Sequence, residues 1–224
     1  MKTLINKVLK NFGYQITRAN GIALSYKILN SYRYFNDKFD RIKDIEGDIV
    51  ECGVGFGHTL FLLFYLADIE NKKRTVWGFD SFIGFPEPTI EDKSTRNPKK
   101  GEWKVITPAE LSDIFFRRGG LPKKSEENLK IIKGYFRDSL PNNEVKKIAI
   151  LHLDVDLYDS YKVCLEYLYS KVEKNGIILF DEYMQKNTQK VFPGAAMAIN
   201  EFFADKKEKI EYDEKFDKYY CRKQ

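Results

Sequence analysis

The chain of 224 residues is poor in the residues that build disulfide frameworks, zinc sites and nucleophilic triads. It has three cysteines, Cys52, Cys164 and Cys221, which form no C-x-x-C pair, and two histidines, His58 and His152. No G-x-S-x-G sequence is present, so neither a Cys/His nor a Ser/His/Asp nucleophile arrangement is supported. Without a secretory signal ahead of the cysteines, we expect unpaired thiols in a reducing, cytoplasmic setting.

Long apolar runs and a strong charge imbalance are also missing. The stretch FLLFYLADI falls far short of the roughly 20 residues that span a bilayer and is typical of a core helix. The net charge is +5, but the lysines stand among acids, as in KKSEENLK and DKKEKIEYDEK, which is typical of solvated faces. No nucleic-acid-binding motif accompanies the charge, so we expect no nucleic acid partner and no transmembrane segment.

Apolar and basic residues alternate through the start of the chain, as in LINKVLKNFGYQI and YKILNSYRYFNDKFDRI. The spacing predicts two or three amphipathic helices, which we interpret as an N-terminal helical cap over residues 1–45. We expect the cap to pack on the rest of the fold or on another subunit, which would give a homo-oligomer. The alternative is peripheral contact of the first helix, through Lys2, Lys7 and Lys10, with a membrane surface.

The most informative stretch begins at Gly47 and reads G-D-I-V-E-C-G-V-G-F-G-H-T. It predicts a buried strand, a glycine-rich turn, and a helix over about 58–70 whose first N–H groups suit an anionic ligand group. A second strand, 75–80, ends in Asp80, 23 residues after Gly57 and close to the offset of about 20 expected for a ribose-binding carboxylate. Strand, turn, helix, strand and acid in this order indicate the nucleoside-cofactor half of a Rossmann-type sheet.

The rest of the chain alternates predicted strands and helices, which indicates one α/β domain over residues 46–224 with a mainly parallel sheet. A closing hairpin gives this sheet one antiparallel edge. The seven predicted strands cover residues 48–52, 75–80, 129–133, 148–153, 176–180, 210–212 and 219–222. Helices are predicted over residues 58–70, 107–118, 158–171 and 195–205.

A polar, proline-bearing stretch follows the second strand, from D-S-F-I-G-F-P-E-P to about Lys104. Long connections without secondary structure are uncommon in compact domains unless they act as lids or binding loops. Thr107, Pro108 and Glu110 then predict a helix start, with a capping threonine, a proline in the first turn and a capping-box acid. We interpret residues 86–120 as a mobile lid over the cofactor end of the sheet, with disorder without function as the alternative.

Acidic residues gather at the predicted ends of two strands. Asp154 and Asp156 follow the fourth strand at positions i and i+2, on one face of an extended chain. Asp181 and Glu182 follow the fifth strand, and ligands of open α/β sheets bind at such carboxyl ends. Four acids would repel one another there unless a cation lay among them, and oxygen ligands alone indicate a hard divalent ion, Mg2+ before Ca2+ or Mn2+. Solvent-facing helix caps are the alternative, and His152 is expected to be a packed strand residue.

Six short sequences in one order carry a resemblance to a known family: E-C-G-V-G-F-G, F-D-S-F-x-G-F-P, G-Y-F-x-D-S-L-P, L-D-x-D-L-Y-D-S, D-E-Y and F-P-G-A. Over residues 47–204 the chain resembles the macrocin O-methyltransferase family. The resemblance implies a Rossmann-like class I methyltransferase with a seven-stranded sheet. It also implies an enzyme that uses S-adenosylmethionine and Mg2+ to methylate a hydroxyl of a sugar or glycosylated small molecule.

The resemblance further implies roles for individual residues. Asp154, Asp181 and Glu182 would ligate Mg2+. Asp156 matches the position proposed as general base and, with Asp154, would form the catalytic pair. The glycine loop and the acid before it would hold the methionine part of the cofactor, the acid that ends the second strand would bind the ribose, and the G-Y-F sequence would line the adenine edge. The cofactor residues implied in this way are Glu51, Gly53, Gly55, Gly57, Thr59, Asp80, Ser81, Gly134, Tyr135 and Phe136.

Other functions fit the same residues. A catechol-like phenol could be the acceptor on the same fold. From another class, the domain could be a nucleotide-binding or scaffolding module without catalysis. A nicotinamide dehydrogenase has less support, because no catalytic Tyr-Lys or His pairing is apparent in the sequence.

Overall fold

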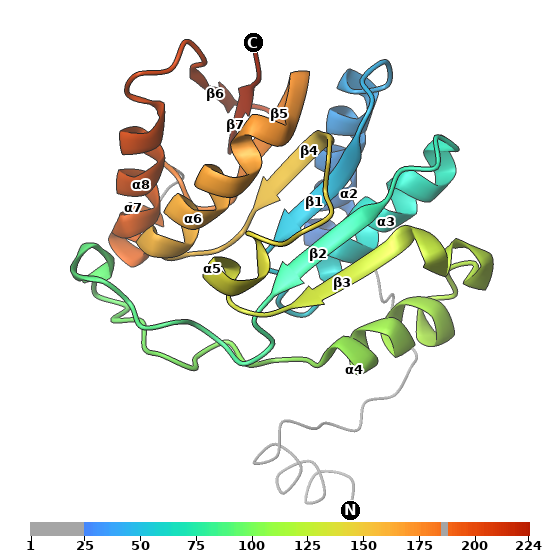
Figure 1. The fold of residues 1–224 in the computed structure, drawn as a ribbon, viewed down its shortest axis with the longest axis horizontal. Coiled ribbons are helices and arrows are strands. Elements are labelled where there is room, and N and C mark those ends of the chain that lie inside the picture. Colours follow the sequence, from blue (N-terminus) through green and yellow to red (C-terminus); the bar gives the residue numbers. More distant parts are fainter. Residues whose placement is uncertain (1–24, 185–187) are drawn as a thin grey trace, which may run out of the picture.

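A computed structural model describes residues 25–184 and 188–224 of the chain. The strands in this part are β1 (Asp48–Cys52), β2 (Val76–Asp80), β3 (Leu129–Lys133), β4 (Ile148–Leu153), β5 (Val172–Phe180), β6 (Ile210–Asp213) and β7 (Lys218–Arg222). They form one sheet in the order β3-β2-β1-β4-β5-β7-β6 (Figure 1). The first five strands pair in parallel, and β7 runs antiparallel to both β5 and β6. The predicted α/β fold, with seven strands and an antiparallel edge, is confirmed.

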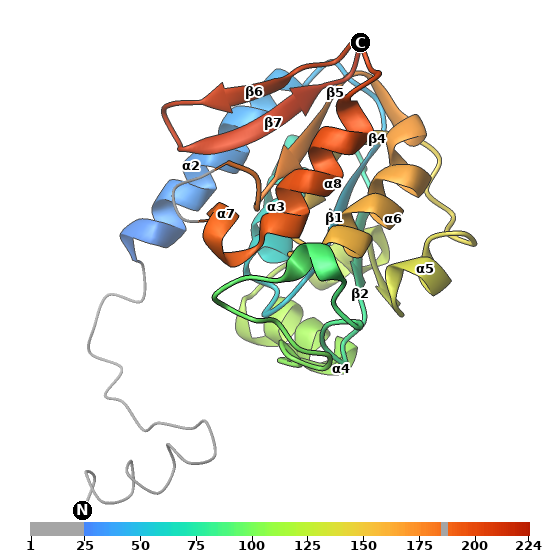
Figure 2. The same cartoon turned by 90° about the vertical axis from the view of Figure 1, so that its left-hand side faces the viewer.

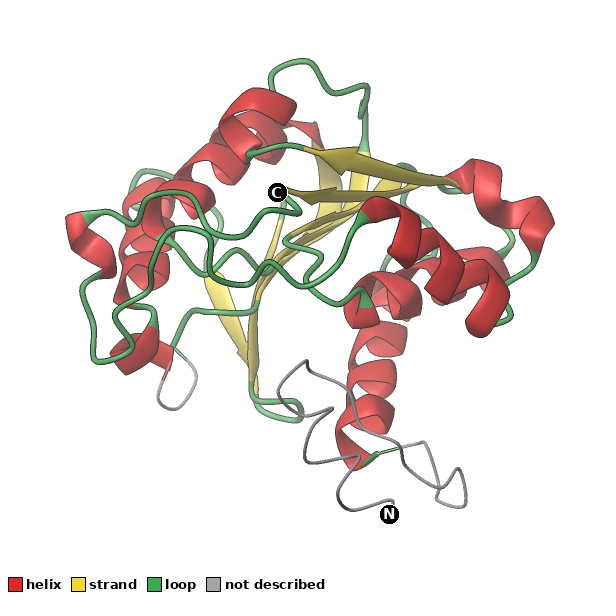
Figure 3. Cartoon of the chain, turned by 90° about the horizontal axis from the view of Figure 1, so that it is seen from below, coloured by secondary structure: helices red, strands yellow, loops and turns green. Residues whose placement is uncertain are grey.

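Helices flank the sheet on both sides, as Figure 3 shows from below. They are α2 (Tyr26–Arg41), α3 (His58–Glu70), α4 (Pro108–Ser112), α5 (Phe136–Ser139), α6 (Tyr158–Leu168), α7 (Thr188–Val191) and α8 (Pro193–Phe203). Side chains of α2 and α3 share one buried core with one face of the sheet, and side chains of α6 and α8 share a second core with the other face. Two cores on one sheet are the three-layer arrangement that alternating strands and helices predict.

The central strands are apolar because both of their faces are covered. All six residues of β4, in the sequence IAILHL, are buried, and β1 is buried from its second residue onward. Continuous apolar runs of this kind are typical of parallel strands with helices on both sides. His152 of β4 is 3% exposed, and the three cysteines are buried and unpaired, as expected from the sequence.

The carboxyl ends of the strands form one polar edge of the molecule. The neighbours of β1 in the sheet are β2 on one side and β4 on the other, so the chain reverses its direction of progress at β1. Ligands of open α/β sheets bind in the crevice at such a point. The β2–α4 connection (residues 81–107) crosses this edge, in green in Figure 1, and lies beneath α7 and α8 in Figure 2.

Two element boundaries differ clearly from the predictions. β5 begins at Val172, four residues before the predicted start. Val172 pairs with Ile148, and the ladder shifts register before it resumes at Ile177 opposite Ile150, so the polar residues 173–175 form an irregularity that reads as a loop in the sequence. The predicted helix over 107–118 is α4 followed by a wider π-helical turn, Asp113–Arg118 (η2). Thr107 caps this helix as predicted, accepting a hydrogen bond from the Glu110 N–H.

The described part of the predicted cap is α2, which packs on the sheet and on the β6–β7 hairpin. Tyr34, Phe35 and Phe39 of α2 are buried in the core on this face. The first basic helix predicted for the cap lies in residues 1–24, outside the described part. Among the helices that the structure describes, none combines the length and apolar character needed to cross a membrane.

Candidate active site

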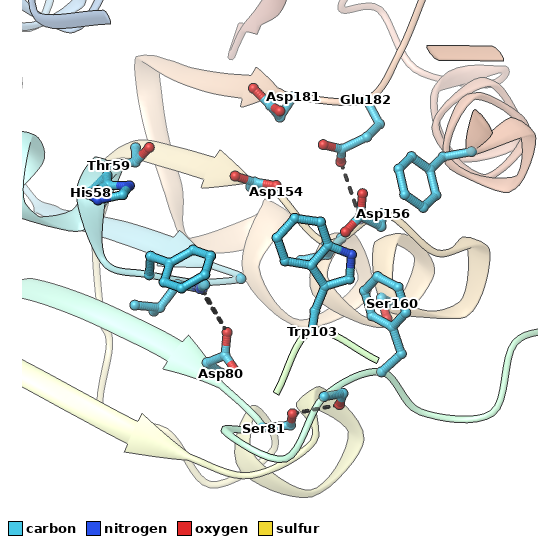
Figure 4. A pocket seen from close by; sticks show the side chains of 18 of the residues that line it. His58, Thr59, Asp80, Ser81, Trp103, Asp154, Asp156, Ser160, Asp181 and Glu182 are labelled. Atoms are coloured by element: carbon cyan, nitrogen blue, oxygen red, sulfur yellow. Dashed lines mark hydrogen bonds between the residues drawn. The ribbon is translucent and has the colours of Figure 1, made fainter. Parts of the chain in front are cut away.

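A cavity of about 1520 Å³ lies at the carboxyl edge, between the glycine loop (residues 53–57), the β2–α4 connection and the tips of β4 and β5 (Figure 4). Most of the site residues expected from the sequence line it. Those on the wall are Gly53, Gly55, Thr59, Asp80, Ser81, Tyr135, Phe136, Asp154, Asp156, Asp181 and Glu182. The expected cofactor residues Glu51, Gly57 and Gly134 are not among the lining residues.

The glycine loop folds over the tip of β4. Gly53 has a φ of +85°, and a Cβ added there would collide with the carbonyl oxygen of Asp154, so this position accepts only glycine. Gly55 has a φ of +53°, and a Cβ there would meet no heavy atom within 4 Å. One glycine therefore brings the loop against the acidic strand end, and the other leaves open space for a ligand.

Asp80 ends β2 and fixes the glycine loop from the neighbouring strand. Its Oδ2 accepts hydrogen bonds from the N–H groups of Val54 (2.8 Å) and Gly55 (3.2 Å), and its Oδ1 accepts one from the Phe82 N–H (2.7 Å). Each carboxylate oxygen has two lone pairs, so Oδ1 can accept a further hydrogen bond from a ligand hydroxyl. Asp80 can therefore shape the loop and still bind a ribose.

The β2–α4 connection is attached to the helices on the far side of the cavity. Asp92 is 2% exposed, and its Oδ1 accepts a hydrogen bond from the Tyr158 N–H (2.8 Å) at the start of α6. The Ser94 hydroxyl donates to the carbonyl of Val191 in α7 (2.7 Å). Trp103, in contrast, is 52% exposed on the cavity wall. The middle of the predicted lid is thus bonded to two helices, and motion of its remainder stays a prediction.

Three carboxylates meet at the tips of β4 and β5. Asp154, Asp181 and Glu182 each offer an oxygen, and these oxygens all lie within 4.8 Å of one another. The strand ends are held together by the Asp181 N–H, which donates to the Leu153 carbonyl (3.0 Å). Oxygen-only ligands at this spacing fit a hard divalent cation such as Mg2+. The alternative of solvent-facing caps fits poorly, because all three acids line one cavity and Glu182 is 5% exposed.

Crowding and burial hold several of these acids away from their ordinary protonation. Burial raises the pKa of Asp154 well above its usual range, and repulsion from Asp181 and Asp156 adds to the shift. Burial, followed by repulsion from Asp181, raises the pKa of Asp156 to about 7. Asp181 differs: burial opposes its ionisation, but the Lys218 ammonium lowers its pKa to about 2. The cluster therefore carries more negative potential than its neighbours neutralise, which is the condition for binding a cation.

Asp156 is held in an unusual backbone conformation beside the three acids. Its φ is +59°, a left-handed value that costs a residue with a side chain on the order of 1 kcal/mol. The Asp156 N–H donates to Oε2 of Glu182 (3.2 Å), and the buried Tyr161 hydroxyl lies 2.9 Å from the same oxygen. Glu182 thus supports the turn that presents Asp156 to the cavity (Figure 4).

Glu51 lies beneath the site. It is fully buried, and its Oε1 is 3.0 Å from Nδ1 of His152. Burial raises the pKa of Glu51 well above its usual range and lowers the pKa of His152 to about 4, so the two groups form a neutral hydrogen-bonded pair. His152 is a packed residue, as expected, and contacts the ring of Phe35 edge-on. The contact of Glu51 with a cofactor stays a prediction.

Three residues that shape the site were not identified from the sequence. Lys218 reaches Asp181 only because of the register of the hairpin, Tyr161 lies one turn into α6, and Asp92 comes from the β2–α4 connection. None of them belongs to a recognisable motif. An acid in an otherwise polar loop and a lysine at a strand start carry no signal until the strands are paired.

Comparison with known families gives one match over most of the chain. The model of the family described as macrocin-O-methyltransferase (TylF) matches residues 33–213. The 8-demethyl-8-(2,3-dimethoxy-alpha-L-rhamnosyl)-tetracenomycin-C 4'-O-methyltransferase of Streptomyces olivaceus is 30% identical over 143 residues, which cover 62% of this chain and 54% of that protein. The mycinamicin III 3''-O-methyltransferase of Micromonospora griseorubida is 27% identical over 164 residues, covering 70% and 61%. The chain spans about half the length of the first relative.

Solved structures give a similar result. A calicheamicin methyltransferase, CalS11, superimposes with a TM-score of 0.77 at 23% identity, covering 89% of this chain and 80% of that one. The O-methyltransferase NovP gives a TM-score of 0.70 at 26% identity, covering 88% and 79%. Most of the chain therefore has the same fold as these proteins.

Proposed function

The chain belongs to the macrocin-O-methyltransferase family and has the fold of a class I methyltransferase, and on this premise we propose that it transfers a methyl group from S-adenosylmethionine to a hydroxyl of a sugar or glycosylated small molecule, assisted by Mg2+. One observation carries the proposal. Three carboxylates suited to a divalent ion and a glycine loop suited to a nucleoside cofactor line the same cavity. Binding both reactants in one cavity is what in-line methyl transfer requires.

The residues around the loop fit S-adenosylmethionine. Gly55 leaves open space on the cavity side, and Asp80 keeps an acceptor for the ribose. Tyr135 and Phe136 line the wall where an adenine would lie beyond Asp80. The buried Oε2 of Glu51 has no hydrogen-bond partner among the described residues, so a donor from the methionine part, directly or through water, would satisfy it. The cofactor supplies a methyl group already activated by its positive sulfonium.

The carboxylates fit Mg2+ as the residues that would hold it, namely Asp154, Asp181 and Glu182. A hard divalent ion at this place would acidify and orient an acceptor hydroxyl, which is otherwise a poor nucleophile at neutral pH. Asp156 lies beside this group on the same cavity wall. Its pKa of about 7 suits a group that accepts a proton near neutrality, so we assign it the role of general base.

Aromatic side chains on the cavity wall support a sugar or glycoside acceptor. Trp103, Phe85 and Phe192 line the cavity on the side of the β2–α4 connection and α7. Such rings stack on the apolar face of a sugar and exclude water from the reacting groups. The relatives named above are a rhamnosyl-tetracenomycin and a mycinamicin methyltransferase, which agrees with an acceptor of this class.

The proposal is tested by incubating the protein with labelled S-adenosylmethionine, Mg2+ and a pool of sugar nucleotides and glycosides, followed by mass spectrometry. We expect label in a sugar hydroxyl. Asp154→Ala should abolish transfer while leaving cofactor binding largely intact, and a chelator should have the same effect on the unchanged protein. Equal activity without the Asp154 carboxylate, or in chelator, would exclude the metal-assisted mechanism.

Two further measurements separate the alternatives. Thermal shift should show stabilisation by S-adenosylmethionine, and stabilisation by NAD alone would reject the methyltransferase assignment. Catechols in the same acceptor pool test for a phenol acceptor.

We also propose that the protein acts in the cytoplasm. The three buried cysteines are unpaired, as thiols are in a reducing compartment. Oligomer formation through the N-terminal helices stays a prediction. Membrane contact of the first predicted helix also stays a prediction, and that helix lies outside the described residues.

A further inference from the structure

A lysine from the antiparallel strand reaches the carboxylate group. Phe180 of β5 pairs with Tyr219 of β7, so the next pair in the same register is Asp181 opposite Lys218. The Lys218 ammonium forms an ion pair and a hydrogen bond with Oδ1 of Asp181. Asp181 lines the cavity and Lys218 is not among its lining residues, so the ammonium reaches the carboxylate from the side of the sheet.

The surroundings of Lys218 are set by the same three acids that would hold a metal. Burial alone would lower the pKa of Lys218, but Asp181, Glu182 and Asp154 together raise it. Its ammonium therefore stays charged, in contact with Asp181 and attracted by the other two carboxylates. The hairpin that carries it lies outside the glycine loop, the acidic strand ends and the β2–α4 connection.

We propose that Lys218 is a positioning residue for the metal site: its ammonium holds one oxygen of Asp181 so that the carboxylate is already oriented toward the cavity when a divalent cation binds. This inference rests on the proposed function, because it takes Asp181 as a metal ligand. Partners that orient a ligand from behind typically change metal affinity 10- to 100-fold when they are removed. A simple counter-charge would act in the opposite direction, since removing a positive charge near the site would let Mg2+ bind more tightly.

The test measures Mg2+ binding by isothermal titration calorimetry for four proteins. Lys218→Met removes the ammonium and keeps the length of the side chain, and Lys218→Arg keeps both the charge and the donors. Lys215→Met is the matched control on the same hairpin, because Lys215 pairs weakly with Asp37 at 3.9 Å and, among the described residues, forms no ion pair with Asp154, Asp181 or Glu182. We expect roughly 10- to 100-fold weaker binding for Lys218→Met. Binding should be recovered in Lys218→Arg and unchanged in Lys215→Met.

Affinity for S-adenosylmethionine, measured on the same samples, shows whether each variant is folded and should not change. If Lys218→Met does not fold, Lys218→Gln replaces it and should bind Mg2+ less tightly than Lys218→Arg. Unchanged or tighter Mg2+ binding in the folded variant lacking the ammonium would overturn the inference and leave the proposed function standing. No Mg2+ binding to the unchanged protein would instead remove the metal from the proposed function.

Discussion

Two lysine–aspartate pairs lie on either side of the β6–β7 hairpin, and they differ in what surrounds them. Asp213 of β6 and Lys218 of β7 are cross-strand partners. Asp213 pairs with Lys38 of α2, and both of those side chains are buried. Lys218 pairs with Asp181, and about a third of each of those side chains is exposed, 32% and 36%. One hairpin therefore supplies an ion-pair partner to the core and another to the cavity.

The groups around the two ammonium ions explain the difference. The Lys38 ammonium bonds Asp213 and lies 4.9 Å and 4.8 Å from the ring centroids of Tyr34 and Tyr220. Its charge is matched by two near acids, Asp213 and Asp37 (3.0 Å), and by ring faces, an arrangement that fixes α2 on the hairpin. Lys218 instead faces three acids and cannot neutralise them. We call Lys38–Asp213 the closed pair and Lys218–Asp181 the open pair. We infer that the closed pair stabilises the fold and that the open pair leaves negative charge for a ligand.

The largest expected effect comes from breaking the closed pair. Asp213→Ala leaves the buried Lys38 ammonium with Asp37, 3.0 Å away, as its remaining carboxylate partner. Removing one partner of a buried ion pair costs about 3–5 kcal/mol, so the free energy of unfolding in urea should fall by about 3 kcal/mol. The control is Asp205→Ala, whose surface pair with Lys206 should matter little. If both variants lose a similar free energy of unfolding, burial does not make the Lys38–Asp213 pair more stabilising than a surface pair.

The pH dependence of stability tests the acids around the open pair, at the cavity. Burial, then repulsion from Asp181, raises the pKa of Asp156 to about 7, although Arg96 acts in the opposite direction. The folded state thus holds a proton that the unfolded state has lost, and metal-free stability should fall as pH rises from about 4 to 7. The loss is as much as about 2 kcal/mol between pH 5 and 7.

Thermal unfolding in chelator measures this loss, with Asp156→Asn as the matched variant. The slope should flatten in the variant and also in the unchanged protein with Mg2+, because the ion favours the ionised acids. If the metal-free stability instead rises across this pH range, the neighbouring groups already neutralise the acidic cluster, and it holds no excess negative charge.

Much of this arrangement could be predicted from the sequence, and the reason is local. The glycine loop, Asp80 and the acids after β4 and β5 sit at element ends, where the strand and helix pattern fixes their position along the chain. Parallel neighbours then bring their carboxyl ends together, as the three carboxylates within 4.8 Å show. The spacing of the motifs therefore predicts the same site that the sheet topology brings together.

The parts that were missed depend on pairing between distant segments. Lys218 meets Asp181 through the register of an antiparallel pair, and a shift of one residue would turn its side chain to the other face. Asp92 meets Tyr158 across 66 residues, from a connection with no strand or helix pattern. The fixed middle of the predicted lid was missed for the same reason, because its anchors are one buried carboxylate, Asp92, and one hydroxyl, Ser94, among other polar residues.

A smaller effect is expected from removing a charge on the open side. Asp154→Asn takes one carboxylate out of a crowded buried group, so in chelator the variant should be more stable than the unchanged protein by about 1 kcal/mol, or roughly 2–4 °C in Tm. With Mg2+ the order should reverse, because only the unchanged protein gains from the ion. Differential scanning calorimetry with and without Mg2+ measures both. If the variant is less stable in chelator, Asp154 stabilises the fold itself, as the closed pair does, and is not held ready for a ligand.

The smallest effect should come from the third lysine near the hairpin turn. Lys215 is 58% exposed at its side chain and 3.9 Å from Asp37, whereas Lys38 is fully buried beside the same acid. An exposed pair at that distance contributes about 0–1 kcal/mol, so Lys215→Met should change the free energy of unfolding by less than about 0.5 kcal/mol in urea. Raising the salt concentration should remove even this change. If Lys215→Met instead costs as much as Asp213→Ala, the stabilisation lies in the net charge of the hairpin, and enclosure of the Lys38 ammonium is not what separates the two pairs.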